Sequence, residues 1–368
     1  MSAGLGAPRF GTEADFALGV EEELILVDPF THALSHHAAG AIESIQDVPG
    51  VGEVKPDTYA AMIELATTVL HDADESARAL SDLRSRVAAT GAKAIGVGLH
   101  PLGEFGDVVH YDAPRYAAIF DQVRGLLSRT PTAATHVHVG MPDAETAIRV
   151  CNGMREYLPL LQALAANSPF WHGLDSGLAT ARAVVFRGFP RSEIPRAFSS
   201  YEDYVETVEG VLVAGDLSDY TFLWWDIRPH PRLGTVEIRS MDAQPDLRSV
   251  AGLAALVHGL ALAEIDRRAR AWPPREALME ASFAAVRDGL EARVPLDGEL
   301  RPAREAARAA LERAQPYVTE LGSADALEGI ERILADGNGA DRQRAAYARG
   351  GMPALLALLV DEAARPYG

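Results

Sequence analysis

The sequence predicts an α+β fold with a sheet-bearing core at about residues 14–245 and a helical part at about 246–368. Several segments of the core alternate polar and apolar side chains with the two-residue period of a strand. Helical segments lie between them, but without the regular order of β-α-β units. Beyond Pro245 the helical period prevails, and no linker rich in Gly or Pro separates the two parts. We therefore expect a single domain whose helical end packs on the core.

The expected elements follow from apolar periodicity and from the residues that begin and end helices. Gly91 is a natural end for a helix, and Pro114 suits a first helical turn. Residues 62–67 fit a strand and a helix equally well. Strands are expected at 16–27, 94–99, 135–141, 181–186, 221–228 and 235–241. Helices are expected at 74–90, 114–129, 144–167 with a kink near Pro159, 248–271, 276–292, 301–314, 324–335 and 340–364.

Charge and cysteine content narrow the class of protein. The formal charge of −18 argues against binding to nucleic acid or to an anionic membrane. The single cysteine, Cys151, excludes an intramolecular disulfide and is expected to pack inside a helix. The N-terminus shows no signal peptide, and His258 and Glu264 interrupt the apolar residues 250–265, so we expect no membrane span. These features favour a cytoplasmic protein.

The run Glu21-Glu22-Glu23 stands inside an otherwise apolar segment. In a strand, Glu21 and Glu23 point to one face and Glu22 to the other. Two buried carboxylates on one face need a compensating cation, which favours Mg²⁺ or Mn²⁺. A solvated edge strand is the other interpretation, and this run alone leaves both open. No role for Glu22 follows from the sequence.

Other strands repeat this arrangement of polar pairs. His136 and His138 share one face of residues 135–140, and Glu237 and Arg239 share one face of 235–241. Asp226 and Arg228 form a similar pair. Each pair alone could be a hydrogen-bonded or ion-paired surface feature, but together they predict a sheet face that binds a metal and an anion. Arginines there would hold phosphate or carboxylate oxygens. No phosphate-binding loop of the Gly-x-x-x-x-Gly-Lys type is present, so any ATP must bind on the sheet itself.

The order of these motifs resembles the glutamate–cysteine ligase type 2 family, in particular its bacterial carboxylate–amine ligase branch. The resemblance spans roughly residues 15 to 350. It rests on residues 19–23, 62–67, 135–140 and 234–242, with further likeness at 167–169, 225–229 and 337–343. It implies a glutamine synthetase-like curved antiparallel sheet with helices behind it, and it makes 62–67 a strand that carries Glu64.

The resemblance also implies ligands and roles. Metal ligands would be Glu21, Glu23, Glu64, His138 and Glu237. His138, His136 and Arg228 would contact the nucleotide, and the catalytic arginines would be Arg182, Arg228 and Arg239. The expected cofactors are ATP and Mg²⁺, with Mn²⁺ as a possible substitute. The expected partners are a glutamate-like carboxylate and a cysteine-like amine, with neither nucleic acid nor membrane, and a homodimer is a family-based expectation.

The implied activity is an ATP-dependent ligase that joins the carboxylate to the amine through an acyl phosphate. The base that accepts the amine's proton is not identified, and Asp226 is a candidate by position only. The alternatives are a guanidino or amino phosphotransferase of the related fold, a non-catalytic nucleotide or metabolite sensor, and a zinc hydrolase that uses His136 and His138. Replacing Glu21 or Glu237 is expected to abolish turnover with little loss of stability.

Overall fold

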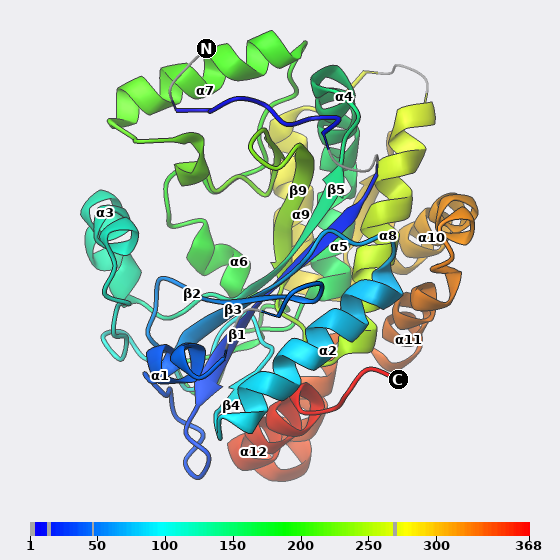
Figure 1. The fold of residues 1–368 in the computed structure, drawn as a ribbon. Coiled ribbons are helices and arrows are strands. Elements are labelled where there is room, and N and C mark those ends of the chain that lie inside the picture. The colour runs from blue at the N-terminus through cyan, green and yellow to red at the C-terminus, as the bar shows by residue number, and fades with distance from the viewer. Residues whose placement is uncertain (1–3, 13–15, 46–47, 268–270) are drawn as a thin grey trace.

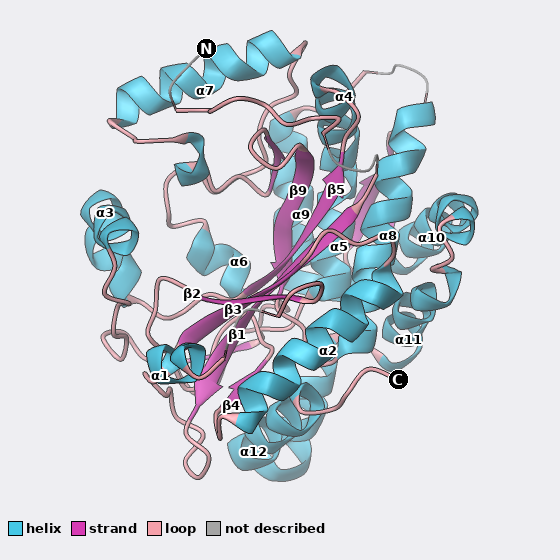
Figure 2. Cartoon of the chain, viewed as in Figure 1, coloured by secondary structure: helices cyan, strands magenta, loops and turns pink. Residues whose placement is uncertain are grey.

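A seven-stranded antiparallel sheet lies at the centre of the molecule (Figures 1 and 2). The computed structural model describes residues 4–12, 16–45, 48–267 and 271–368. The strand order is β2-β3-β1-β5-β9-β8, and β4 pairs with the end of β1. The strands are β1 (Leu18–Val27), β2 (Gly52–Pro56), β3 (Met62–Thr67), β4 (Lys93–Ile95), β5 (Ala134–Gly140), β8 (Ile227–His230) and β9 (Thr235–Asp242). The prediction of an α+β fold built on an antiparallel sheet is confirmed, and residues 62–67 are a strand.

Helices cover one face of this sheet. Those that pack on it are α2 (Ala73–Ala89), α4 (Ala144–Met154), α5 (Leu158–Ala165) and α8 (Leu247–Asp266). Behind them lie α9 (Arg275–Asp288), α10 (Ala303–Glu320) and α11 (Glu328–Asp336). The remaining helices are α1 (Ala38–Glu43), α3 (Pro114–Val123), α6 (Ala181–Phe186), α7 (Tyr201–Gly215) and α12 (Gly339–Ala363). Figure 1 shows α3 and α6 on the opposite side of the sheet, the open face, where Leu355 and Leu359 of α12 also share a hydrophobic cluster with Ile25 of β1.

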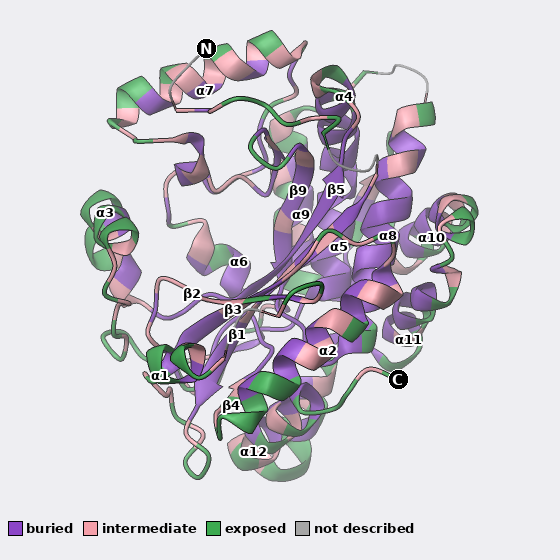
Figure 3. Ribbon diagram, in the orientation of Figure 1, coloured by how far each residue is buried: buried purple, intermediate pink, exposed green. Residues whose placement is uncertain are grey.

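The alternation along the strands explains why one face is covered. On β1 the side chains of Leu18, Val20 and Leu24 are buried in the main hydrophobic core. The same core takes Val137 from β5 and Ile238 from β9. Burial of this shared apolar face, which Figure 3 shows as a continuous buried centre, holds the sheet and its helices together and leaves the polar alternates on the other face.

In the described chain one helix, α8, is long and apolar enough to cross a membrane, with a mean hydropathy of 1.4. However, 83% of its apolar stretch is buried inside the molecule. Its two interrupting polar residues also have hydrogen-bond partners there: the His258 Nε2 bonds the Phe16 carbonyl at 2.7 Å, and Glu264 accepts from the Tyr157 hydroxyl at 3.0 Å. The burial of α8, more than the polar interruptions, therefore marks it as the central helix of the core.

Two predicted strands are wrong in whole or in part. Residues 181–186 form helix α6, because the Thr180 hydroxyl caps the first turn by accepting from the Ala183 amide. In 221–228 only the last two residues enter a strand. Asp219 caps a short 3-10 helix at Tyr220–Phe222, and the chain then runs irregularly to β8. Both segments are apolar enough to be mistaken for strands, and only their polar caps indicate the turns.

Other boundaries also shift. The strand expected at 94–99 ends at Ile95, and a side chain at Gly96 would collide with the Gln244 carbonyl. The helix expected at 144–167 breaks at a 3-10 turn, Arg155–Tyr157, just before Pro159. A hairpin of β10 (Arg293–Leu296) and β11 (Glu299–Pro302) precedes α10 inside the helical part, and a second small hairpin joins β6 (Phe170–Trp171) to β7 (Leu174–Asp175). The last residues of the helix expected at 248–271 include 268–270, which lie outside the described residues.

Candidate active site

The open face of the sheet carries a cleft of about 270 Å³. All nine residues predicted for the site line it, although they come from β1, β3, β5, β8, β9 and α6. They are Glu21, Glu23, Glu64, His136, His138, Arg182, Arg228, Glu237 and Arg239. The structure thus brings together residues that are up to 218 positions apart in the chain (239 − 21).

Strand register explains this convergence. His138 on β5 lies directly opposite Glu237 on β9, which lies opposite Arg228 on β8. On the other side, Glu21 faces His136 across β1 and β5. Residues directly opposite one another in an antiparallel sheet point to the same face. Each polar pair inferred from one strand therefore becomes part of a continuous polar surface across the sheet.

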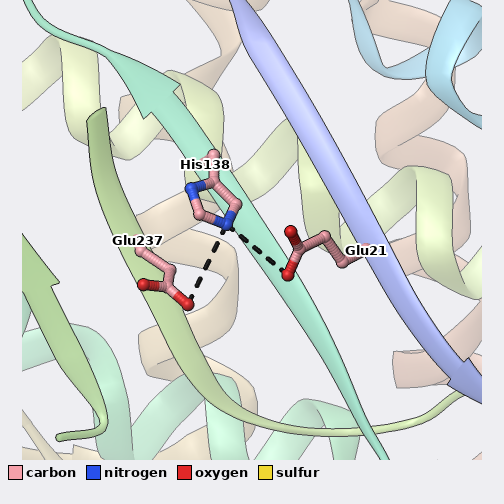
Figure 4. A group of neighbouring side chains, drawn as sticks. All are labelled: Glu21, His138 and Glu237. Carbon is pink, nitrogen blue, oxygen red and sulfur yellow. Dashed lines mark ion pairs between the residues drawn. The ribbon is translucent and has the colours of Figure 1, made fainter. Parts of the chain in front are cut away.

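Glu21, His138 and Glu237 form a group that could hold a metal ion (Figure 4). Their ligand atoms lie within 4.8 Å of one another. The His138 Nε2 is 3.7 Å from a Glu21 oxygen and 3.9 Å from a Glu237 oxygen, and it has no hydrogen-bond partner among the described residues. Its Nδ1 is held by the Thr235 hydroxyl at 3.0 Å. A buried imidazole nitrogen between two carboxylates fits a divalent cation.

Glu23, Glu64 and Asp57 form a second acidic group beside the first. Glu23 lies directly opposite Glu64 in the register of β1 and β3. Burial, followed by the charge of Asp57, raises the pKa of Glu23 to about 8. Burial and the charge of Glu21 raise the pKa of Glu64, and burial raises that of Asp57. Carboxyl groups that oppose each other's ionisation are typical of a site that cations neutralise.

Glu237 is both a candidate ligand and an ion-pair partner. Arg228 and Arg239 both contact its carboxylate, and their charges hold its pKa well below the usual range against the effect of burial. The other guanidinium donors of Arg228 bond the carbonyls of Thr221 and Leu223. Replacing Glu237 would leave the buried Arg228 and the half-buried Arg239 without their carboxylate, so the expectation that its loss would hardly affect stability is not supported.

Arg182 is held at the cleft by a buried polar network. Its Nη1 lies 3.8 Å from Asp242, at the end of β9. The Asp242 carboxylate also accepts hydrogen bonds from the hydroxyls of Ser168 (2.7 Å) and Thr180 (2.9 Å) and from the Asn167 amide (2.9 Å). The Arg182 Nε is buried and makes no hydrogen bond within the described part of the chain. This guanidinium therefore keeps a donor for an anion in the cleft.

Two motifs that had no role in the sequence analysis belong to the same hydrogen-bond network. Gln343, in the first turn of α12, donates to the side-chain oxygen of Asn167 at 2.7 Å, and Asn167 donates to the carbonyls of Gly96 and Ala243. Asn338 caps α12 and donates to the Ala163 carbonyl. The segments 167–169 and 337–343 thus brace the far side of Asp242, behind Arg182.

Sequence reasoning missed several residues of the cleft. Asp57 lies in the turn after β2, and Tyr59, Arg115 and Trp224 come from loops and from α3. The segments of Asp57, Tyr59 and Arg115 do not alternate, so no periodic signal could have found these residues, whereas Trp224 lies in the segment 221–228 that was expected to be a strand. Asp226 was the candidate for the base that accepts the amine's proton. It is not among the described residues that line the cleft. Its carboxylate is buried with one oxygen 3.7 Å from Arg187.

Glu22 points away from the cleft, as the alternation predicts, and the structure supplies the role that the sequence did not. It forms a buried ion pair with Arg84 of α2, with Nη2 and Nε at 2.6 Å and 3.0 Å from its two oxygens. Arg84 also donates to the carbonyls of Gln244, Pro245 and Ala363. Glu22 therefore ties the sheet to the helices behind it.

A second cavity of about 230 Å³ adjoins the first and shares Glu21 and His138 with it. Its other walls are mostly small or apolar side chains, with Lys55 and Arg9 among the charged ones. The described lining also includes Ala17, Gly19, Ala66, Gly140, Leu233 and Gly234. The candidate metal group therefore stands between two spaces of different character.

Comparison with known proteins identifies the family. The model of the glutamate–cysteine ligase family 2 matches residues 17–358. The chain belongs to this family. It is 39% identical over 351 residues to a Rubrobacter xylanophilus protein named "Putative glutamate–cysteine ligase 2-3", covering 93% of this chain and 95% of the relative. It is 38% identical over 263 residues to the glutamate–cysteine ligase of Haloferax volcanii, covering 70% of this chain and 72% of the relative. This confirms the family inferred from the motifs.

Solved structures show the same fold. The glutamate–cysteine ligase of Francisella tularensis in complex with AMP superposes with a TM-score of 0.69 at 13% identity, over 96% of this chain and 89% of that one. The ligase PafA, in its complex with the ubiquitin-like protein Pup, gives a TM-score of 0.56 at 12% identity, over 96% of this chain and 73% of that one. The family assignment also confirms the predicted class of enzyme, an ATP-dependent ligase that forms carbon–nitrogen bonds.

Proposed function

We propose that this cleft joins a glutamate-like carboxylate to a cysteine-like amine, with Mg²⁺ or Mn²⁺ bound at the acidic groups. The observation that carries the proposal is the buried His138 Nε2, which faces Glu21 and Glu237 without a hydrogen bond among the described residues. Glu23 and Glu64, with Asp57 as an addition from the structure, would complete the ligand set. A bound divalent cation would neutralise the nucleotide phosphates and let an anionic carboxylate approach them.

The arginines divide into two roles. Arg182 and Arg239 each keep a buried Nε without a hydrogen-bond partner in the described chain, so we assign them to the transferring phosphoryl group and the substrate carboxylate. The guanidinium donors of Arg228 bond the Glu237 carboxylate and the backbone carbonyls of residues 221 and 223. We therefore assign Arg228 to positioning Glu237 and the adjoining loop more than to contacting substrate. His136, hydrogen-bonded to Glu21 at 3.2 Å, would orient that carboxylate.

The two cavities suggest where the substrates bind. We propose that the nucleoside of ATP occupies the second cavity and that its phosphates reach Glu21 and His138, which line both spaces. The carboxylate would then lie in the main cleft, beside Arg182 and Arg239, and the acyl phosphate would form between them. Ala66 lies opposite Glu21 and lines the second cavity, so Ala66→Leu should raise the KM for ATP. An unchanged KM for ATP would place the nucleoside elsewhere.

The decisive experiment is an ADP-release assay with Mg²⁺ in which carboxylates are paired with amines. ADP that forms only when both partners are present, together with a stoichiometric amide product, is the expected result. ADP with an amine or guanidino compound alone would indicate a phosphotransferase. Tight ATP binding without ADP from any pair would indicate a sensor, and hydrolysis that does not respond to ATP would indicate a zinc hydrolase.

The single-domain organisation, the homodimer and the cytoplasmic location stay predictions.

A further inference from the structure

Strand β2, at one edge of the sheet, carries one of the two lysines in the chain. The sequence has 34 lysines and arginines together, and only Lys55 and Lys93 are lysines. Lys55 lies directly opposite Glu64 of β3, which lies opposite Glu23 of β1. Because residues opposite one another point to the same face, Lys55 extends this acidic row to the edge of the open face.

The Lys55 ammonium forms ion pairs with two carboxylates. Its Nζ is 2.9 Å from a Glu53 oxygen and 3.8 Å from a Glu64 oxygen. An ammonium has three donors, so at least one is left for a further acceptor. Its flexible four-carbon chain also lets it turn from one acceptor to another more readily than the planar fork of an arginine.

Lys55 stands at the boundary between the two cavities. Its side chain lines the second cavity together with Glu21 and His138, which also line the main cleft. Its ion-pair partner Glu64 lines the main cleft. A nucleotide whose nucleoside lies in the second cavity and whose phosphates reach Glu21 and His138 would therefore pass the ammonium.

The nucleotide side of this boundary needs a positive charge. Glu21 and Glu53 both line the second cavity, and their carboxylates would repel a triphosphate. The arginines assigned to the substrate line the main cleft only. In the described lining of the second cavity the lysine and arginine side chains are Lys55 and Arg9, of which Arg9 is exposed and Lys55 is partly buried. Lys55 is therefore the less solvent-screened of the two charges.

We propose, resting on the nucleotide placement in the proposed function, that Lys55 binds a phosphate group of the nucleotide at the boundary of the two cavities. In this role the ammonium turns from Glu53 to the phosphate, and Glu64 is left to the proposed cation. Lysine binds phosphate as a compact point charge, so the exchange requires only a rotation of its side chain.

Nucleotide binding tests this inference without turnover. The dissociation constant of a non-hydrolysable ATP analogue can be measured by calorimetry on the full chain with Mg²⁺. Lys55→Met should weaken binding about 10-fold, because it removes a charge-assisted hydrogen bond. Lys93→Met is the matched control: this lysine is exposed on β4, and its loss should leave the affinity unchanged. Equal affinity in Lys55→Met and the unaltered protein would overturn the inference.

A second variant distinguishes a phosphate ligand from a structural ion pair. If Lys55 served only its ion pair with Glu53, Glu53→Gln would weaken nucleotide binding as Lys55→Met does. If Lys55 binds phosphate, Glu53→Gln frees the ammonium and removes a negative charge from the cavity, so the nucleotide should bind as tightly or more tightly.

The affinity for Mn²⁺ shows whether the contact is direct. It should not fall in Lys55→Met, because the substitution removes a positive charge from beside the acidic groups. Electron paramagnetic resonance of free Mn²⁺ measures it in the same variant. Parallel weakening of Mn²⁺ and nucleotide would mean that Lys55 acts through the metal, and it would contradict the inference.

The scarcity of lysine allows a direct readout. Acetylation of each lysine can be followed by mass spectrometry of the full chain after digestion. The ATP analogue with Mg²⁺ should slow acetylation of Lys55 at least about 10-fold and leave that of Lys93 unchanged. Undiminished acetylation of Lys55 at a saturating concentration of the analogue would contradict the inference.

The ADP assay separates this inference from the ligase function. Weaker nucleotide binding in Lys55→Met, with no ADP from any pair of substrates, would refute the ligase and leave Lys55 as a phosphate ligand. ADP that forms only with both substrates, with the same KM for ATP in Lys55→Met and the unaltered protein, would confirm the ligase and refute the role of Lys55. Absence of any binding of the analogue to the unaltered protein would refute both.

Discussion

Glu21 and Glu22 are consecutive residues of one strand, yet the two faces of the sheet treat their charges differently. Glu22 is fully buried, and Arg84 neutralises it while bonding three backbone carbonyls. Glu21 lies among other carboxylates and beside a His138 nitrogen that makes no hydrogen bond in the described chain. The charge of Glu22 is thus neutralised by an arginine of the packed helix, whereas Glu21 has histidines beside it, one of which keeps a nitrogen for a ligand. The partner of each carboxylate, more than its burial, therefore separates these two residues.

The largest expected effect is on the open face. Glu21→Gln should lower kcat by at least about 10³-fold, because it removes a charge that the proposed cation requires. The free energy of unfolding should also fall, because against the effect of burial His138 and His136 hold the pKa of Glu21 well below its usual range, so that its ionised form stabilises the fold. Steady-state ADP release and urea unfolding would measure the two effects. Near-normal turnover in this variant would refute the metal assignment.

A substitution on the covered face should lower the stability of the fold and leave turnover unchanged. Arg84→Met leaves Glu22 buried and unpaired, so the free energy of unfolding should fall by about 3–5 kcal/mol, while the folded fraction keeps its kcat. The double variant Glu22→Leu with Arg84→Met should recover most of this loss. Urea unfolding monitored by circular dichroism would test both. A loss of kcat without a loss of stability would show that Glu22 acts in the site.

A third substitution tests whether the hydrogen-bond network around Asp242 also supports catalysis. Asp242→Asn keeps the shape but removes the charge that faces Arg182, and kcat should fall by about 10²-fold through misplacement of that arginine. Mn²⁺ affinity should stay unchanged. Asp246 is a matched control: it is also a buried carboxylate with arginine partners, but it caps α8 away from the described cleft lining. A fall in kcat of equal size in Asp246→Asn would make the effect a general loss of structure.

The smallest effect is expected at Thr235, whose hydroxyl bonds the Nδ1 of His138 and so directs Nε2 toward Glu21 and Glu237. Thr235→Val should raise the dissociation constant for Mn²⁺ by about 10-fold, and Thr235→Ser should restore it. Electron paramagnetic resonance of free Mn²⁺ measures this without turnover. Equal Mn²⁺ affinity in Thr235→Val and the unaltered protein would mean that the hydroxyl does not orient the imidazole.

Periodicity predicted the faces of the clearest strands: Glu21 and Glu23 share one side of theirs, because a two-residue period leaves only two faces to choose between. Glu64 was placed in the site through the resemblance, because residues 62–67 fit a strand and a helix equally well. Arg182 was placed in the site through the resemblance although its segment was expected to be a strand, and it is a helix. Asp57 was missed because a turn has no period.

By itself the sequence determined the family, the α+β class and the faces on which the charged residues lie, because local periodicity and motif order are written along the chain. Only the tertiary structure decided that Arg84 neutralises Glu22 and that Asp242 holds Arg182. These contacts join residues that are 62 positions apart for Glu22 with Arg84 and 60 for Arg182 with Asp242 (242 − 182). No local pattern encodes such pairs, because they form only when packing brings distant segments together.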